Sequence, residues 1–436
     1  MNRILLVGNG AREHAIAESL RMSDNVELFA FMSRMNPGIK GLTTKYKIGD
    51  LSDNNSILDF AQKMKTDFAV IGPEDPLENG IVDTLEQIGV DSASPSKKMS
   101  KLEWSKAYAR NILKKHRIEA YPDFHVFSKK NGSTDTIFRD VKKILKDWNN
   151  EVAIKPDYLT GGKGVKVWGD HFNSTEEILT YVENVLNTGN KKVIIEQKLS
   201  KPEKLKNSEF TLQAFVSGTT IVCMPLVQDY KRAYDDDKGP NTGSMGSYSC
   251  ANHNLPFLTK NDYNFAIDVM KKTVYAIGGY KGVLYGQFML ANDGVKLIEF
   301  NCRFGDPEVM NVLPLLTDNF AVCCKEIIEG TLKQKSWNEK ATVCVYLTPK
   351  GYPTQTEENK EIFVNKEAIL KHGCKLYYAS VKEASENSVL TTRSRAIGLL
   401  GIGDSINEAR KLAYHALNDV SGDLHYRLDI AERIEN

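Results

Sequence analysis

Several features that mark other protein classes are missing from this 436-residue chain. No apolar run approaches the roughly 20 residues that span a bilayer, and the start, "MNRILLVGNG", enters a strand pattern without a signal peptide's cleavage site. The seven cysteines are odd in number and irregularly spaced, which argues against a disulfide framework. The formal net charge is +1, so no overall field attracts nucleic acid or an anionic membrane. We therefore expect a reduced, cytoplasmic protein in which local charges hold any anionic ligand.

The order of strand and helix patterns divides the chain into three parts. Strand patterns alternate with helical ones over about the first hundred residues, which predicts a doubly wound parallel sheet. A helix from Lys101 to Lys115 and a second α/β region follow, with hairpins turning at Ser217–Gly218 and at Asn292–Gly294. The last hundred residues predict a small, separate α+β domain. The expected domains are 1–101, 102–333 and 334–436.

The stretch "KPDYLTGGKGVKVW" (155–168) is typical of a phosphate site. Three glycines, Gly161, Gly162 and Gly164, surround Lys163, and Lys155 precedes them. A P-loop would place Ser or Thr directly after the lysine to reach the metal, and this stretch has neither there. The phosphate site must therefore be of another kind.

Two further glycine turns follow predicted strands. The turn "GNGAREH" can hold a phosphate at the helix start, with an arginine beside it. A dinucleotide site would also need an acidic residue about 20 positions on, where Arg34 stands instead. Because both turns end parallel strands, we expect them to form one crevice, although each could also be a purely structural turn. The residues concerned are Gly10, Arg12, Glu13, Gly72, Pro73 and Glu74.

Two polar stretches later in the chain carry the remaining candidates. "QDYKRAYDDDKGPNTGSMGSYS" is either a solvated charge run or a binding loop, and its small residues leave backbone amides free for a ligand. In "KLIEFNCRFGDPE", strand alternation places Leu297, Glu299 and Asn301 on one face. A carboxylate and an amide oxygen two residues apart suit Mg²⁺, and Gln287 on the partner strand could add a third oxygen.

Taken together, these motifs resemble the ATP-grasp superfamily, in which two sheets grip ATP. More narrowly, "GNGAREHA", "IGPEDPLENGIVD", "GGKGV", "GPNTGSMG" and "IEFNCRFGDPE" occur in the order found in the phosphoribosylamine–glycine ligase family. The resemblance runs from residue 3 to about 312 and continues more weakly to "HYRLDI". It implies an α/β multidomain fold: an N-terminal doubly wound sheet, a central ATP-grasp domain with a mobile subdomain at about 120–195, and a small C-terminal α+β domain.

The resemblance also implies a reaction and roles. Glycine and 5-phosphoribosylamine would be joined by a monomer or homodimer that uses ATP with Mg²⁺ or Mn²⁺. ATP would be bound by Lys155, Gly161, Gly162, Lys163, Gly164, Glu196, Gln197, Leu199 and Glu209, and the metal by Gln287, Glu299 and Asn301. Arg303, Lys155, Lys163 and Asp229 would be catalytic. The other substrates would meet Gly10, Arg12, Glu13, Gly72, Pro73, Glu74, Asp229, Lys231, Arg232, Asn241, Thr242, Gly243, Arg303, Gly305 and Asp306.

Three alternatives remain open at this point. Another ATP-grasp carboxylate–amine ligase or a biotin-dependent carboxylase would share Lys155, Lys163, Glu299 and Asn301, but has no reason to carry "GPNTGSMG" and "NCRFGDPE". A nicotinamide oxidoreductase rests on the first glycine turn alone. A nucleotide sensor without catalysis would not need both the lysines and the metal pair.

Overall fold

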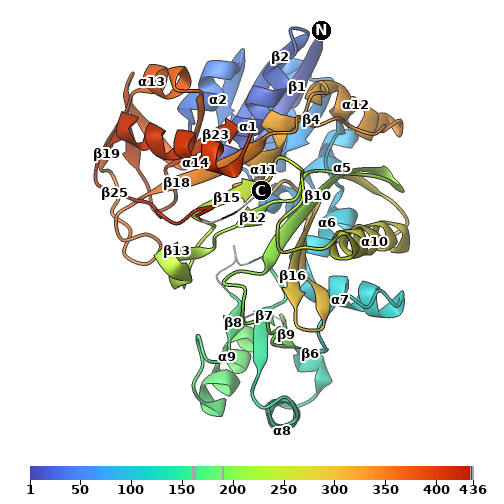
Figure 1. Ribbon diagram of the computed structural model, residues 1–436. Coiled ribbons are helices and arrows are strands. Elements are labelled where there is room, and N and C mark those ends of the chain that lie inside the picture. Colours follow the sequence, from blue (N-terminus) through green and yellow to red (C-terminus); the bar gives the residue numbers. More distant parts are fainter. Residues whose placement is uncertain (160–163, 189–190, 433, 435–436) are drawn as a thin grey trace.

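The computed structural model describes residues 1–159, 164–188, 191–432 and 434. Figure 1 shows the N-terminal strands (blue) and the C-terminal elements (orange and red) together at the top, with helices α8 and α9 below the central strands. In this described part of the chain, no helix is both long enough and apolar enough to cross a membrane. The expected α/β multidomain architecture is confirmed.

The N-terminal sheet is parallel, as predicted, with the strand order β3-β2-β1-β4-β5. Its strands are β1 (Asn2–Val7), β2 (Val26–Met32), β3 (Lys45–Ile48), β4 (Phe68–Ile71) and β5 (Asp91–Ser92). Its helices are α1 (Ala11–Arg21), α2 (Pro37–Leu42), α3 (Asn54–Met64), α4 (Glu74–Asn79) and α5 (Ile81–Glu86). β1 and β4 lie side by side, so the two glycine turns that follow them open at the same edge of the sheet.

The helix expected from Lys101 to Lys115 is two helices, α6 (Lys97–Trp104) and α7 (Lys106–Lys115). Ser105 between them is extended, with φ −126° and ψ 95°, and its hydroxyl accepts the Tyr108 amide hydrogen at 3.2 Å. A serine N-cap thus starts a second helix inside a continuous helical pattern, which the periodicity alone did not reveal.

A small antiparallel sheet with the order β6-β9-β7-β8 follows. Its strands are β6 (Phe124–Ser128), β7 (Val152–Pro156), β8 (Lys166–Val167) and β9 (Lys192–Gln197). Two helices cover it, α8 (Thr134–Asp147) and α9 (Thr175–Asn187), and a short turn η1 (Lys129–Asn131) follows β6. The apolar stripes of both helices pack on the strands, so this part has a core of its own.

The large antiparallel sheet has the order β11-β10-β16-β17 and contains both predicted hairpins. Its strands are β10 (Glu209–Gly218), β11 (Thr220–Cys223), β16 (Tyr280–Ala291) and β17 (Gly294–Asn301). Helices α10 (Lys260–Ala276), α11 (Glu308–Val312), η3 (Leu313–Leu315) and α12 (Phe320–Glu329) accompany it.

A bulge in β17 corrects the expected phase of the metal candidates. Gln287 pairs with Glu299 and Phe288 with Leu297, so Ile298 is the extra residue. Leu297 and Phe300 both enter the core, whereas Glu299 is only half-buried. Simple alternation placed Leu297 on the face of Glu299, and this was wrong because the bulge reverses the phase between them.

The C-terminal sheet includes two strands from the middle of the chain, β12 and β15. Its order is β12-β15-β18-β23-β20, and β25 also pairs with β18. These strands are β12 (Gln228–Asp229), β15 (Gly246–Ser249), β18 (Ala341–Pro349), β20 (Cys374–Tyr378), β23 (Ile397–Gly403) and β25 (Leu424–His425). β12 and β15 flank the polar loop of residues 229–246, so the C-terminal sheet anchors both ends of that loop.

Two smaller sheets complete the fold. One has the order β21-β22-β19-β24, from β19 (Glu361–Val364), β21 (Val381–Ser385), β22 (Ser388–Thr391) and β24 (Val420–Ser421). The other is a hairpin of β13 (Arg232–Tyr234) and β14 (Lys238–Asn241), joined by η2 (Asp235–Asp237). The remaining helices are α13 (Lys366–Lys371), α14 (Ile406–His415) and η4 (Ala416–Asp419).

Candidate active site

A cavity of about 520 Å³ lies between the small sheet and the large sheet. Its volume is in the range of small-molecule sites. We refer to it as the central cavity. The predicted residues that line it are Lys155, Glu196, Gln197, Leu199, Glu209, Asp229, Lys231, Arg232 and Asn241.

One wall of the central cavity is a buried charged triad. Glu196, 2% exposed, accepts a hydrogen bond from Arg110 Nε at 2.6 Å and lies 2.6 Å from Lys155 Nζ. Burial would raise the pKa of Glu196, but Arg110 and Lys155 outweigh it and lower the pKa to about 2. Burial lowers the pKa of Lys155, and Glu196 opposes that effect. The triad therefore keeps a lysine at the cavity wall in a fixed place.

A second charged group lies on the large-sheet side. Lys231 Nζ is 2.6 Å from Glu209 Oε2 and 3.7 Å from Asp229 Oδ1. Burial raises the pKa of Asp229 to about 7, although Lys231 works in the opposite direction. Asp229 Oδ1 is buried and has no hydrogen-bond partner within the described residues. A buried oxygen of this kind can accept a hydrogen bond from a donor group of a ligand.

Glu299 is surrounded by positive charge. Burial would raise its pKa, but the charges of Lys106, Lys155, Lys231 and Arg303 outweigh burial and lower it. No described side chain forms an ion pair with Glu299 within 4 Å. A carboxylate held ionised among cations, with no direct partner there, suits the binding of a divalent ion that arrives with anionic phosphates.

The other two metal candidates have partners inside the chain. Asn301 Oδ1 accepts from Arg303 Nη2 at 3.3 Å. Gln287 is 1% exposed; its Oε1 accepts from the hydroxyls of Thr211, at 3.1 Å, and Tyr285, and its Nε2 donates to Glu209 at 3.2 Å. In this arrangement the oxygen that would bind a metal is turned toward hydroxyl groups. No cluster of three or more His, Cys, Asp or Glu suited to a metal occurs in the described ranges.

Arg303 connects the metal candidates to the N-terminal domain. Its Nε donates to Glu74 at 3.2 Å, and its Nη2 lies 3.0 Å from Glu103 Oε1. Burial would lower the pKa of Arg303, but Glu103 and Glu74 outweigh it and raise the pKa. Burial raises the pKa of Glu103 to about 7 against the influence of Arg303. The sequence predicted Arg303 and Glu74 as separate site residues, and the structure brings them into contact.

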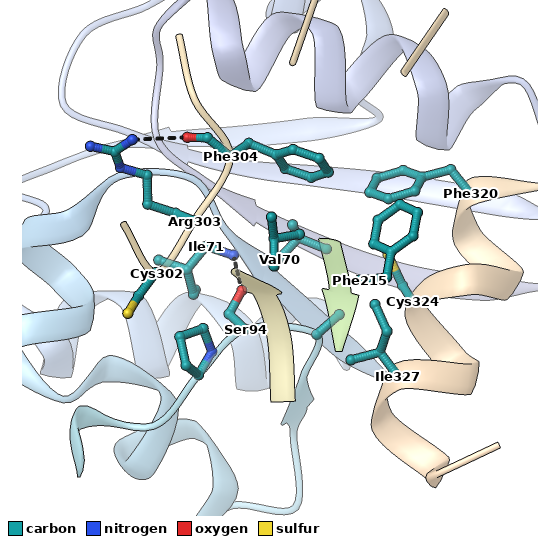
Figure 2. Close-up of a pocket in the computed structure, with 13 residues that line it drawn as sticks. Val70, Ile71, Ser94, Phe215, Cys302, Arg303, Phe304, Phe320, Cys324 and Ile327 are labelled. Carbon is teal, nitrogen blue, oxygen red and sulfur yellow. Dashed lines mark hydrogen bonds between the residues drawn. The ribbon is translucent and has the colours of Figure 1, made fainter. Parts of the chain in front are cut away.

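The space behind Arg303 is not a ligand site. Figure 2 shows the rings of Phe215, Phe304 and Phe320 around a small cavity, with the Arg303 guanidinium extending away from them to the Phe304 carbonyl. That cavity has a volume of about 10 Å³, at most enough for one water molecule. The phenylalanine cluster forms a packed base that supports Arg303.

The first glycine turn is filled by Glu13. A Cβ atom on Gly8 or Gly72 would lie within 3 Å of the Glu13 side chain, so these glycines make room for it. Glu13 in turn accepts from the Gly10 amide at 2.5 Å and from Arg12 Nε at 2.6 Å. The amide and the guanidinium expected to bind phosphate therefore already have a carboxylate partner. Pro73 starts α4 beside this turn.

The loop of residues 241–246 is held by an arginine that sequence reasoning missed. Arg395, from the C-terminal region, donates to the carbonyls of Gly243 and Ser244 and to the Asp306 carboxylate at 2.8 Å. Thr242 turns inward, and its hydroxyl donates to the Lys231 carbonyl at 2.8 Å. Gly305 donates its amide to Gln213 at 2.8 Å. The predicted loop residues thus form one network with "GDP" at 305–307.

Part of the glycine–lysine stretch lies outside the described residues, namely Gly161, Gly162 and Lys163. Gly164 is described, and its carbonyl accepts from the Tyr181 hydroxyl at 2.7 Å.

Two more cations near the site, Lys106 and Arg110, were not among the candidates, because α7 was read as the later part of one longer helix. Lys106 is the first residue of α7, where the helix dipole disfavours a cation. A lysine directly after a serine N-cap is the signal that could have indicated a ligand-facing role.

Three family models cover most of the chain: the phosphoribosylglycinamide synthetase N domain (residues 2–103), its ATP-grasp (A) domain (104–309) and its C domain (342–433). The chain belongs to the phosphoribosylglycinamide synthetase family. Similar members are phosphoribosylamine–glycine ligases of Methanocaldococcus jannaschii, 42% identical over 99% of this chain and 96% of that protein, and of Methanococcus maripaludis, 44% identical over 98% and 96%.

Solved structures agree with this assignment. A phosphoribosylamine–glycine ligase from Thermotoga maritima superimposes with a TM-score of 0.79 at 26% identity, covering 98% of this chain and 100% of that one. The biotin carboxylase domain of a Hydrogenobacter thermophilus 2-oxoglutarate carboxylase, a complex with MgADP, gives a TM-score of 0.72 at 15% identity, covering 98% and 91%. The second likeness shows the ATP-grasp fold alone.

Proposed function

We propose that this member of the phosphoribosylglycinamide synthetase family joins glycine to 5-phosphoribosylamine, using ATP, to give glycinamide ribonucleotide, ADP and phosphate in purine biosynthesis. The observation that carries the proposal is the convergence of Lys106, Lys155, Lys231 and Arg303 on the carboxylate of Glu299 beside the central cavity. Lys155, Lys231 and Arg303 also have carboxylate partners of their own, so these cations are held in place beside Glu299. The nearly full-length match to named ligases supports the choice of substrates.

ATP is assigned to the central cavity. Gln197 and Leu199 line it from the end of β9 and would face the adenine, and Glu209 would face the ribose. Lys155 and Lys106 would neutralise phosphate oxygens, with Gly161, Gly162, Lys163 and Gly164 closing over them as the sequence predicts.

Mg²⁺ or Mn²⁺ would be held by Glu299 and Asn301, whose oxygens suit a hard cation. Gln287 is a third ligand only if its amide turns, because its oxygen is engaged by Thr211 and Tyr285. When bound, the metal would supply neutralisation of phosphate charge.

The proposed chemistry is two successive displacements. A carboxylate oxygen of glycine attacks the γ-phosphorus, ADP leaves, and glycyl phosphate forms. The amine of phosphoribosylamine then attacks the acyl carbon, loses a proton and expels phosphate as the amide forms. Arg303 would stabilise charge on the transferring phosphoryl group. Asp229, whose pKa is about 7, is suited to hold or accept a proton near the reacting groups.

Phosphoribosylamine and glycine are assigned to the predicted substrate-binding residues near Arg303 and Asp229. These residues are Gly10, Arg12, Glu13, Gly72, Pro73, Glu74, Lys231, Arg232, Asn241, Thr242, Gly243, Gly305 and Asp306. We further propose the domain limits 1–101, 102–333 and 334–436, a cytoplasmic location, and a monomer or homodimer acting on small molecules.

ADP release from Mg²⁺-ATP tests the proposal, with glycine alone, with fresh phosphoribosylamine alone and with both. We expect release only with both substrates. Turnover with a different carboxylate and amine, but none with this pair, would retain the ATP-grasp chemistry and overturn the substrates.

A further inference from the structure

A segment near the C-terminus lies against the hairpin that lines the central cavity. Residues 424–431, here called the C-terminal strap, begin with β25, which pairs with β18. They then run along residues 232–241, the β13–β14 hairpin, here called the cavity hairpin. His425 starts this contact, because its Nε2 lies 2.8 Å from the Ala233 carbonyl oxygen and its ring packs edge-on against Tyr234.

Arg427 is the centre of the strap. It is only 1% exposed, although it is an arginine near a chain end. Its Nε and Nη2 donate to the two carboxylate oxygens of Asp429, each at 2.7 Å. Its Nη1 donates across to the hairpin, to the Arg232 carbonyl at 3.1 Å and to Asp237 Oδ1 at 2.9 Å. Arg427 thus uses its planar fork on the strap and on the hairpin at once, which a lysine cannot do.

The turn of the cavity hairpin has a conformation that needs outside support. Asp236 and Asp237 both have positive φ, 59° and 54°, the left-handed region that disfavours side chains with a Cβ atom. The strap supports each residue of this turn: the Leu428 amide donates to Asp235 at 2.8 Å, and the Asp236 amide donates to Asp429 at 2.9 Å. Two successive residues in this region persist only where the surroundings hold them.

The cavity hairpin also faces the ligand space. Arg232, Asp237 and Asn241 all line the central cavity. Arg232 also reaches across the cavity mouth to the small-sheet side, where its Nη2 lies 2.7 Å from Asp170. Contacts that hold the cavity hairpin in place therefore also hold one wall of the central cavity and the Arg232–Asp170 ion pair.

We propose that Arg427 is a positioning residue for nucleotide binding: the C-terminal strap holds the cavity hairpin in its binding shape through Arg427 and Asp429. This inference rests on the proposed function in one respect, the assignment of ATP to the central cavity. It adds that the affinity for ATP depends on the C-terminal strap, although no strap residue lines the central cavity.

The test compares Arg427→Gln with Arg410→Gln in the full-length chain. Arg410 is a matched control, because it donates to the strap carbonyls of Leu428, at 2.6 Å, and Ile430, at 3.0 Å, but to no residue of the hairpin. The Kd for Mg²⁺-ATP is measured by calorimetry, and hydrogen exchange of residues 232–241 is followed in parallel. Asp429→Asn is the second variant if Arg427→Gln does not fold, since it keeps the shape of the side chain.

We expect Arg427→Gln and Asp429→Asn to raise the Kd for ATP about tenfold or more, with faster exchange in the hairpin, because charge-assisted hydrogen bonds are lost. Arg410→Gln should leave the Kd within about twofold. The KM for ATP should rise while kcat at saturating ATP changes little. An unchanged Kd in both variants, or an equal rise in Arg410→Gln, overturns the proposal. Failure of the ligase assignment would appear separately, as wild-type protein that binds ATP without glycine-dependent turnover.

Discussion

Glu196→Gln is the substitution that tests the charged wall of the central cavity most sharply. It keeps the size of the side chain and removes the carboxylate that lies between Arg110 and Lys155. Arg110 also donates to the Ile298 carbonyl at 2.7 Å, so the same group links α7 and the small sheet to the large sheet. The variant leaves two buried cations without this carboxylate.

The cost follows from the pKa of Glu196. A fall from 4.5 to about 2 corresponds to about 3 kcal/mol of preference for the ionised form in the folded state. A separate estimate agrees, because removing one partner of a buried ion pair lowers the free energy of unfolding by about 3–5 kcal/mol. Since the folded-state pKa is depressed, this stability is fully present above about pH 4.5 and is lost as the pH falls toward about 2.

Thermal unfolding between about pH 7 and pH 3 measures the effect. Glu196→Gln should lower the midpoint by about 3–5 °C near pH 7, with a smaller difference from wild type at low pH. Glu183→Gln is the matched control, because Glu183 is exposed on α9 of the same small domain, and its midpoint should match wild type. If Glu196→Gln and Glu183→Gln have the same unfolding midpoint at every pH, the triad does not stabilise the cavity wall.

The remaining predictions concern pH, metal and catalysis. Burial lowers the pKa of His14 to about 4, so wild type should lose about 3 kcal/mol as the pH falls from about 6.5 to 4, a loss that His14→Gln should not show in unfolding scans. Glu299→Gln should reduce ADP release at least roughly 100-fold with little change in unfolding midpoint, whereas unchanged turnover would remove Glu299 from the site. Excess EDTA should abolish ADP release, with Mg²⁺ or Mn²⁺ restoring it, and turnover that persists in EDTA would contradict the metal assignment.

The strands and most helices were predictable because they follow from local patterns. The first five strands form the predicted parallel sheet, and the turn at Asn292–Gly294 joins β16 and β17 as expected. Local patterns failed where one residue changes the geometry. The bulge at Ile298 reversed the strand phase, and Ser105 divided one predicted helix into two.

The lining of the central cavity was predictable only where a motif stands beside the ligand space. Lys155, Asp229 and Asn241 belong to such motifs. Arg395 and Arg427 come from distant parts of the chain, and their partners are backbone carbonyls and aspartates that carry no pattern of their own. Arg12 shows the converse: the residue type suited a phosphate, but Glu13 beside it already occupies the guanidinium.

The transfer of oxygen from glycine tests the central claim most directly. Wild-type protein is given Mg²⁺-ATP, phosphoribosylamine and glycine labelled with oxygen-18 in its carboxylate, and the products are analysed by mass spectrometry. The proposed chemistry predicts one labelled oxygen in the phosphate for each amide formed, because that oxygen attacks the γ-phosphorus. Unlabelled phosphate, or labelled glycine recovered without amide, would contradict it.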